Sequence, residues 1–404
     1  MKRLLIEGWR ELHHSYALVA QQHSLCMLER PGIDLRFREI PFFSPRWQRV
    51  AGIFDEAAEA KLAGIPSPEP GFAPDATLNM QAERPDFSAP RSGLKFVFGT
   101  PEYRVLRHEN LAGIATAAAV PQSVHVLTPS RWTAAAYERF GFEPHRIHVV
   151  PHGVDPAVVR PEAADREVAR QAMGLGDAFV FMSVGAMTGN KGIDLLLRAF
   201  GAVASHHPHA RLLLKGADAL YSSRDSLRAA LTALPASARE RVASRLLYQG
   251  STFSARQMAT FMRAADCYVA PYFAEGFNMP VLEAAGCGVP VICTEGGPTD
   301  EFTTFDFASR VTSTPIEVAL DHGQTGDALQ PDYEHLVQCM VSAASDPEAT
   351  QARGVAAARH VAQNYTWAKV TDRLLAEMLG TDGRVSSSRE SPAGKPDVVD
   401  EGLR

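Results

Sequence analysis

Short apolar runs alternate along this chain with segments in which apolar positions recur every three to four residues. The runs at 95–98, 124–128 and 147–150 are four or five residues long and each stops near a Gly, Thr or Pro. The pattern restarts at 179–184, and the segment 193–203 that follows has helical spacing. Strands that alternate with helices predict an α/β fold, with parallel sheets covered by helices on both faces.

The first ninety residues are less regular. We expect a strand at 4–6, a helix from Ser15 to Leu28 with Ser15 as its N-cap, and a second strand at 35–40. Residues 41–92 are rich in proline and show little periodicity. Loops and short helices are therefore the prediction for that segment.

The chain has 404 residues, which is too long for one typical core and favours two or three domains. A segment rich in Ala, Asp, Glu and Pro at 156–177 separates the two runs of strands. We therefore expect an N-terminal domain over 1–160 and a C-terminal domain over 161–364. A terminal amphipathic helix is expected at 365–380. The composition of 381–404, with Gly, Ser, Pro and mixed charges, predicts a flexible tail.

Charge and cysteine content narrow the class of protein. The formal net charge of −6 gives no overall attraction to nucleic acid, so no nucleic-acid partner is expected. The five cysteines form no CxxC pair and no zinc spacing, which indicates reduced thiols in the cytoplasm. No stretch has the ~18 apolar residues of a spanning helix. Peripheral contact with the inner membrane surface stays open.

The segment 275–292 carries the clearest chemical signal. A predicted strand ends just before it, at the sheet edge where such folds bind ligands. Gly276 allows a ligand to approach the backbone, and Pro280 suits the first turn of a helix. The free N–H groups of that helix start favour a diphosphate. Glu275 and Glu283 would accept hydrogen bonds from sugar hydroxyls. The alternative is that both are surface glutamates that solvate a helix.

This segment resembles the E-x7-E motif of retaining GT-B glycosyltransferases, in particular glycosyltransferase family 4. The resemblance covers most of 95–380, is strong over 178–300 and weak over 1–94. It implies two Rossmann-like domains facing each other across a cleft, the N-terminal one for the acceptor and the C-terminal one for the donor. In that family the first Glu contacts the transferred sugar and the second binds the ribose, roles that fall to Glu275 and Glu283.

The resemblance also implies the reaction. A hexosyl group would pass from a nucleotide sugar to an acceptor hydroxyl with retention of anomeric configuration, for instance in cell-surface polysaccharide or glycoconjugate synthesis. A UDP- or GDP-sugar would be the co-substrate, without a cofactor or a metal. Asp300 and Glu301 are expected to cap the following helix instead of binding a metal ion. The sugar, the base, the acceptor, the linkage and the oligomeric state are not determined by the sequence.

Donor-side residues follow from the same resemblance. Lys191 would hold the pyrophosphate and stabilise the leaving nucleotide. The family usually has Arg directly after Gly185, where this chain has Ala186. Lys215, at the end of the next predicted strand, is the candidate to compensate. The full donor-binding set is Glu283, Lys215, Gly276, Phe277, Asn278, Met279, Gly185 and Ser15.

Acceptor-side residues are expected in the N-terminal half. Glu102 stands where some family members place a Glu that faces the sugar, so we group it with Glu275 and Lys191 as catalytic. His14 and Arg10 lie in a loop that replaces the Gly-rich loop of the family, and His152 lies at the domain junction. Each of these residues also has a purely structural interpretation.

Two alternative functions stand beside this one. The missing Arg at 186 leaves room for a non-catalytic nucleotide-sugar-binding protein on the same fold. An NAD-dependent oxidoreductase is disfavoured, because 184–187 lacks the second Gly of G-x-G-x-x-G. Turnover of a donor distinguishes the first of these from an enzyme.

Overall fold

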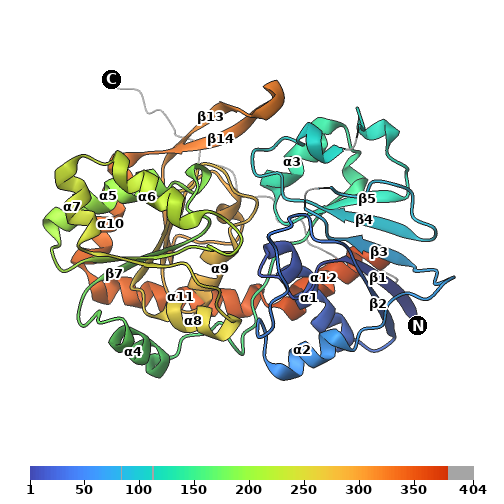
Figure 1. The fold of residues 1–404 in the computed structure, drawn as a ribbon, viewed down its shortest axis with the longest axis horizontal. Coiled ribbons are helices and arrows are strands. Elements are labelled where there is room, and N and C mark those ends of the chain that lie inside the picture. The colour runs from blue at the N-terminus through green and yellow to red at the C-terminus, as the bar shows by residue number, and fades with distance from the viewer. Residues whose placement is uncertain (83, 112, 381–404) are drawn as a thin grey trace, which may run out of the picture.

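A computed structural model describes residues 1–82, 84–111 and 113–380, so the tail predicted at 381–404 lies outside the described residues. The first sheet has six strands in the order β2-β1-β3-β4-β5-β6, all paired in parallel (Figure 1). Its strands are β1 (Lys2–Gly8), β2 (Ile33–Glu39), β3 (Ala76–Asn79), β4 (Leu94–Phe98), β5 (Val124–Thr128) and β6 (Ile147–Val149).

The second sheet also has six parallel strands, in the order β12-β11-β10-β7-β8-β9. The predicted α/β class with two Rossmann-like domains is confirmed. The strands are β7 (Val180–Val184), β8 (Arg211–Lys215), β9 (Leu246–Gln249), β10 (Cys267–Ala270), β11 (Val291–Thr294) and β12 (Ala308–Val311). A separate antiparallel hairpin follows, formed by β13 (Ser313–Ala319) and β14 (Thr325–Pro331).

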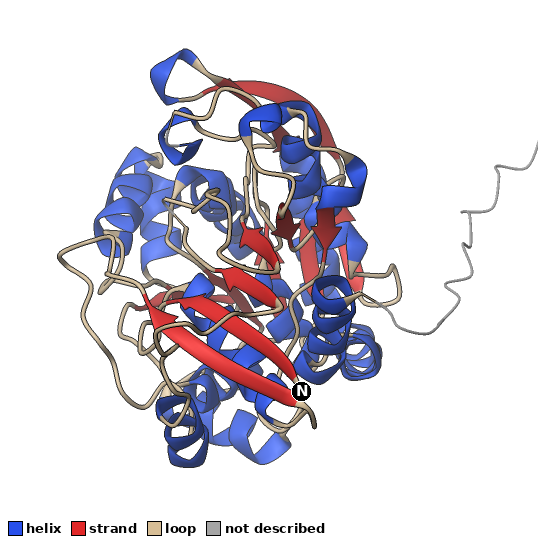
Figure 2. Ribbon diagram, turned by 90° about the vertical axis from the view of Figure 1, so that its right-hand side faces the viewer, coloured by secondary structure: helices blue, strands red, loops and turns tan. Residues whose placement is uncertain are grey.

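Helices cover both faces of the sheets, as Figure 2 shows from the side. The first domain contains α1 (Ser15–Leu28), α2 (Glu56–Ala63) and α3 (Arg131–Phe140). The second contains α4 (Ala163–Ala172), α5 (Ile193–His206), α6 (Ser223–Ala233), α7 (Ala236–Ala243), α8 (Ala255–Arg263), α9 (Met279–Gly286), α10 (Tyr333–Ser345) and α11 (Pro347–Asn364).

The last helix, α12 (Trp367–Leu379), packs on the first domain. Trp367, Val370 and Leu374 are buried in the same apolar cluster as residues of β1 and α1. Figure 1 shows α12 beside α1 under the first sheet, while α11 lies under the second. The end of the chain therefore links the two domains a second time.

Two local predictions for the first domain were wrong. β3 lies at the centre of the first sheet, between β1 and β4, in a segment where we expected loops and short helices. All four of its residues are buried, so it has no alternation of apolar and polar positions to reveal it. Ser15 is the first residue of α1 and not its cap, because the His14 side chain accepts the hydrogen bond from the Tyr16 amide.

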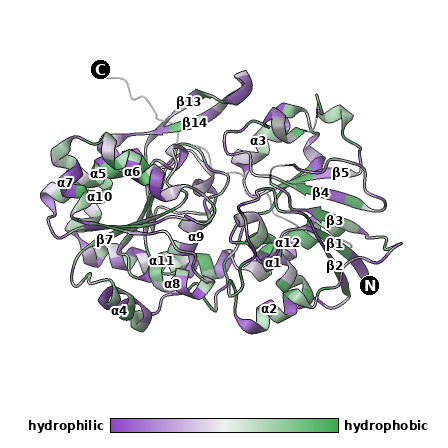
Figure 3. Ribbon diagram, in the orientation of Figure 1, coloured by the Kyte–Doolittle hydropathy of each residue, from purple (hydrophilic) through white to green (hydrophobic). Residues whose placement is uncertain are grey.

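The second sheet reverses its strand order between β7 and β10, which lie side by side. In open parallel sheets such a reversal opens a crevice at the carboxyl ends of the strands, where ligands bind. Figure 3 shows that β3 and β4 of the first sheet are largely hydrophobic and that the tip of the β13–β14 hairpin is hydrophilic. Among the described residues, no helix has both the length and the hydrophobicity needed to cross a bilayer.

Candidate functional site

Two loops meet at the carboxyl ends of β7 and β10. The loop after β7 ends in a short turn with Lys191, and the loop after β10 contains Glu275. Gly192 has a φ of +72°, and a Cβ on it would lie 2.0 Å from the carbonyl oxygen of Pro271. The amide of Phe273 donates to the carbonyl of Asn190 at 2.8 Å. Close backbone contact therefore fixes the two loops against each other.

A third loop, from the first domain, completes the site. Lys191 Nζ lies 2.7 Å from Glu275 Oε2 and 3.1 Å from Glu102 Oε1, and Glu102 follows β4 of the first domain. Asn190 Nδ2 donates to the other oxygen of Glu102 at 3.0 Å. Lys191 is thus within hydrogen-bond distance of the two other residues that we grouped as catalytic, one from each domain.

Burial and charge perturb this cluster strongly. Burial raises the pKa of Glu275 to about 7; the nearby Lys191 ammonium lowers it and Glu102 raises it further. Burial lowers the pKa of Lys191, but the charges of Glu102 and Glu275 outweigh that effect, so its pKa lies above its usual range. Lys191 therefore stays charged, and Glu275 can hold a proton near neutral pH.

Helix α9 begins at Met279, one short loop after Glu275. Asn278 caps it in the left-handed conformation, with a φ of 71°, which Asn tolerates better than most residues. Pro280 lies in the first turn, as predicted. Glu283 is half-buried in the helix, and burial raises its pKa to about 7. No ion-pair partner of Glu283 occurs among the residues described by the structure.

Gly276 and Phe277 lie at the junction of the two domains. A Cβ on Gly276 would lie 2.8 Å from Thr100 Cβ of the first domain, and Ser130 Oγ donates to the Gly276 carbonyl at 2.7 Å. The ring of Phe277 is buried and stacks on Phe302, with ring centroids 4.6 Å apart. The side chain of Phe277 therefore packs inside the protein and does not face a donor. Met279 is half-buried and packs against the cores of both domains.

Lys215 ends β8 at the same edge of the sheet. It is buried, donates to the carbonyl of Gly216 and lies over the ring of Phe253, 5.1 Å from its centroid. Burial lowers its pKa to about 8, with a small opposing effect from Asp218. Lys215 is therefore a buried cation with weaker carboxylate pairing than Lys191. Gly185 lies close to Lys191, whose Cγ would be 3.7 Å from a Cβ at that glycine.

His13 is a residue that the sequence analysis missed. Burial lowers the pKa of His13 to about 4, and the charge of Lys215 lowers it further. His13, in the loop after β1, therefore lies near Lys215 at the donor-side edge of the second sheet. The sequence offered a signal in the His13-His14 pair within that loop. It could not tell which imidazole faces the cleft, because that depends on how the two domains dock.

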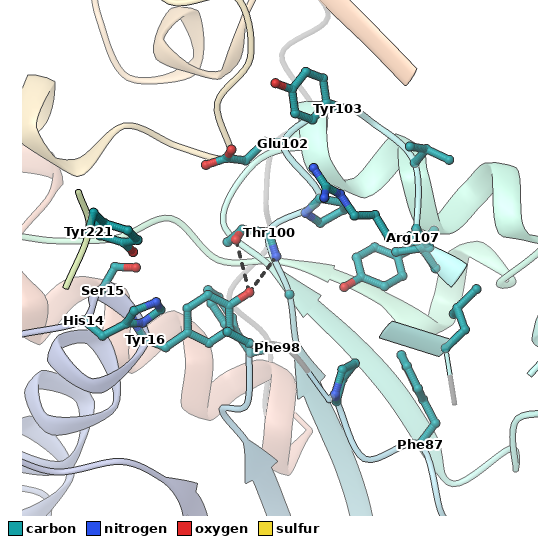
Figure 4. A pocket seen from close by; sticks show the side chains of 18 residues that line it. His14, Ser15, Tyr16, Phe87, Phe98, Thr100, Glu102, Tyr103, Arg107 and Tyr221 are labelled. Atoms are coloured by element: carbon teal, nitrogen blue, oxygen red, sulfur yellow. Dashed lines mark hydrogen bonds between the residues drawn. The ribbon is translucent and has the colours of Figure 1, made fainter. Parts of the chain in front are cut away.

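A cavity of about 340 Å³ opens beside Glu102 in the first domain (Figure 4). His14 and Ser15 line it, and burial lowers the pKa of His14 to about 4. The Tyr16 hydroxyl and Thr100 Oγ1 lie 3.1 Å apart at its wall. The aromatic lining of the cavity was not predicted from the sequence. It consists of Tyr16, Phe87, Phe98, Tyr103, Tyr137 and, from the second domain, Tyr221.

Two predicted acceptor-side residues lie elsewhere. The Arg10 guanidinium pairs with Glu39 at 2.6 Å and donates to the carbonyl of Leu62, so it fastens its own domain and does not line the cavity. His152 is buried between Phe98, Phe277 and Trp367 at the junction of the domains. Burial lowers its pKa to about 3, so it packs there as a neutral ring.

The expectation that Glu301 caps a helix following it in the chain was wrong, and Glu301 instead contacts the other domain. No α-helix directly follows it; its carboxylate accepts hydrogen bonds from the amides of Arg131 at 2.8 Å and Trp132 at 3.3 Å. It therefore caps α3 of the other domain. Asp300 accepts from the amide of Gly296 at 2.8 Å. The described part of the chain contains no group of three or more His, Cys, Asp or Glu residues placed to hold a metal ion.

Comparison with known families decides the relationship. Residues 178–346 match the family described as glycosyl transferases group 1, and residues 97–158 match glycosyltransferase family 4. The chain therefore contains glycosyltransferase domains of these two descriptions over the matched residues. The two matched regions contain Glu102, Lys191, Glu275 and Glu283, whereas the predicted residues Arg10, His14 and Ser15 lie outside them.

A relative in Mycobacterium tuberculosis is named D-inositol 3-phosphate glycosyltransferase. It is 31% identical over 258 residues, which are 63% of this chain and 48% of the relative. The chain thus spans about half the length of the relatives that it matches.

Solved structures share the fold at low sequence identity. Anabaena HepE, solved with UDP and glucose, has a TM-score of 0.66 at 14% identity over 93% of this chain and 98% of HepE. A Rickettsia africae glycosyltransferase has a TM-score of 0.66 at 12% identity, over 94% and 100% of the two chains. WaaG, involved in lipopolysaccharide biosynthesis, has a TM-score of 0.61 at 16% identity over 94% and 100%. The chain therefore has the GT-B fold.

Proposed function

We propose that this protein transfers a hexosyl group from a nucleotide sugar to an acceptor hydroxyl with retention of anomeric configuration. The main observation in support of this proposal is a cluster of charged side chains. Glu102, Lys191 and Glu275, from both domains, form one charged cluster at the carboxyl edge of the second sheet, in which Glu275 is buried and the other two are half-buried. An acid with a raised pKa beside a cation in a crevice, as for Glu275 beside Lys191, is typical of catalytic sites. The matches to glycosyl transferases group 1 and to family 4 support the same class of reaction.

The donor diphosphate would bind where cations and free amides converge. The start of α9 offers backbone N–H groups, and Lys191 and Lys215 lie at the neighbouring strand ends. Lys191 is paired with two carboxylates, so a diphosphate would have to replace at least one of them. Lys215 is buried but forms no ion pair with a carboxylate among the described residues, which supports its role in place of the usual Arg at 186. Glu283 would bind the ribose hydroxyls.

The reaction would proceed on one face of the sugar. As the bond from the anomeric carbon to the phosphate oxygen breaks, the electron pair passes to the leaving diphosphate, whose growing charge Lys191 and Lys215 would stabilise. The acceptor oxygen forms the new bond, and its proton goes to a leaving-phosphate oxygen. Glu275 would hold the sugar hydroxyls in place. No step requires a metal ion in this scheme.

The acceptor would enter the cavity beside Glu102. Its aromatic walls suit the apolar faces of a sugar ring, and Glu102 at its end lies 3.1 Å from Lys191, where the reaction would take place. HepE was solved with UDP and glucose, which favours a UDP-sugar over a GDP-sugar. We place the reaction in the cytoplasm, with growing polysaccharides or glycoconjugates at the inner membrane surface as candidate acceptors.

The decisive experiment combines donor binding with turnover. UDP-, GDP- and ADP-sugars are screened by thermal unfolding, and a true donor at 100 times its Kd adds about 2.7 kcal/mol of stability. Release of the nucleotide is then measured for the wild type and for Glu275→Ala, which should lose activity by about a hundredfold or more. Glu295→Ala, a carboxylate after β11 at the same edge, is the matched control and should stay active.

The outcomes separate the alternatives. A donor that stabilises the protein without any turnover would favour a non-catalytic nucleotide-sugar-binding protein. Absence of stabilisation by every nucleotide sugar tested would contradict both functions.

A further inference from the structure

The β13–β14 hairpin belongs to the second domain but reaches the first. It follows β12 at the end of the second sheet, and its strands pair from Ser313 and Pro331 to Ala319 and Thr325. In Figure 1 it lies above the space between the domains, with its tip toward α3. Hydrogen bonds and ion pairs join the hairpin to the first domain.

Asp327 on β14 makes three of these contacts. Its amide donates to the carbonyl of Tyr103 at 2.8 Å. Its carboxylate pairs with Arg104 at 3.3 Å and also with Arg139 of α3. Arg139 in turn donates to the carbonyl of Arg104 at 3.3 Å, so the hairpin, the loop after β4 and α3 share one polar network.

Gln324 and Gly326 extend the contact along the same loop. The side-chain oxygen of Gln324 accepts from the His108 amide at 3.0 Å, and its nitrogen donates to the Leu106 carbonyl at 3.0 Å. A Cβ on Gly326 would lie 2.8 Å from Tyr103 Cβ, so only glycine permits this approach. Backbone groups of the loop therefore find their hydrogen-bond partners on the other domain.

This loop, residues 102–108, is the part of the first domain closest to the proposed chemistry. It carries Glu102, and Tyr103, Leu106 and Arg107 line the cavity. Arg104 within it has a φ of 55°, a conformation that residues other than glycine seldom adopt without support. The amide of Arg104 donates to the carbonyl of Pro101, directly before the loop, and its other contacts include Asp327, Arg139 and the ring of Trp132.

We infer that the β13–β14 hairpin is the acceptor-positioning element of this protein, with Asp327 and Gln324 as positioning residues. The hairpin shapes the 102–108 loop from the donor domain, so the acceptor cavity is complete only when the two domains are together. Neither residue touches the proposed reacting atoms. The expected effect on KM for the acceptor rests on the proposed function. The support of the 102–108 loop by the hairpin does not depend on any activity.

Two variants of the full-length chain test the inference, Asp327→Asn and Gln324→Ala. Glu317→Gln is the matched control, because Glu317 is exposed and stands directly opposite Asp327 in the hairpin register. Hydrogen exchange of the peptide 103–111 should rise at least about threefold in both variants and stay unchanged in the control. The amide of His108, which loses its acceptor in Gln324→Ala, is the sharpest reporter.

Kinetics provide the second readout. With the donor identified by the thermal screen and a hydroxyl acceptor that the wild type uses, KM for the acceptor should rise about fivefold in Asp327→Asn, since each partly exposed ion pair contributes modestly. Hydrolysis of the donor by water should stay at the wild-type rate, because Lys191 and Glu275 are untouched. A general loss of stability would instead lower both the rate of transfer to the acceptor and the rate of donor hydrolysis.

Each failure has its own meaning. Unchanged exchange of 103–111 in both variants would overturn the inference, whatever the activity of the protein. Increased exchange with an unchanged KM for the acceptor would also overturn it, since the loop would then be supported by the hairpin without positioning the acceptor. A wild type that turns over no donor would contradict the proposed function, while the exchange experiment would still test the hairpin.

Discussion

At the scale of single residues, the two lysines of the site differ in whether carboxylates balance their charge. Lys191 has two carboxylates within 3.1 Å, whereas Lys215 has the ring of Phe253 and a backbone carbonyl. Removing Lys191 is costly for Glu275, because that buried carboxylate then loses its compensating charge. The two lysines should therefore respond differently to substitution.

Replacing Lys191 should affect catalysis most. In Lys191→Met the carboxylates of Glu102 and Glu275 face each other without a cation, and the leaving diphosphate loses its stabilisation. We expect kcat for donor turnover to fall by about 10²–10³-fold. Steady-state release of the nucleotide measures this. Lys61→Met removes an exposed lysine and should leave kcat unchanged; a Lys191→Met enzyme as active as that control would refute the role.

Lys215 should give donor binding a pH dependence. Burial lowers its pKa to about 8, so the ammonium is present below pH 8 and is lost as the pH rises through that value. Donor affinity should therefore weaken above pH 8. In Lys215→Arg the guanidinium stays charged and the weakening should disappear. In Lys215→Ala the donor Kd should rise about tenfold or more at pH 7. Calorimetric titrations between pH 6.5 and 9.5 test all three; an unchanged KM and kcat in Lys215→Ala would reject the assignment.

At the scale of elements, α12 and the β13–β14 hairpin each belong to one domain in sequence and contact the other in space. Helix α12 follows α11, which packs on α9 of the second domain, yet its buried face completes the core of the first. The hairpin leaves the second sheet and supports a loop of the first. One contact is apolar and the other polar, so α12 should mainly stabilise the protein and the hairpin should mainly position a loop.

Leu374 tests the stabilising role of α12. Its side chain is fully buried in the core of the first domain, so Leu374→Ala should lower the free energy of unfolding by about 2–5 kcal/mol. Leu375, the next residue, is only half-buried, and Leu375→Ala should cost clearly less. Urea denaturation followed by circular dichroism compares the two. Equal losses would mean that the helix does not dock by this face.

At the scale of the whole molecule, the domains meet along several separate contacts. Glu301 of the second domain caps α3 of the first, and the amide of Ala255 donates to the carbonyl of Ile53 at 3.0 Å. Thr100 packs on Gly276, and Glu102 reaches Lys191. The proposed reaction needs this arrangement, because donor and acceptor groups come from different domains and water must be kept out.

The sequence by itself was enough to predict the α/β pattern of the second domain and the motif at its edge. Most of its strands are short runs rich in apolar residues, and the motif from Glu275 to Glu283 is contiguous, so both depend on neighbours in the chain. Strand β12 contains Ser309 and Arg310 and shows no such run. The tertiary structure decided the rest. β3 is recognisable as a strand only through its partners β1 and β4, and the β13–β14 hairpin only through its pairing. Which histidine faces Lys215, and whether Glu102 meets Lys191, depends on how two separate cores dock, and no local pattern encodes a contact between residues that lie far apart in the chain.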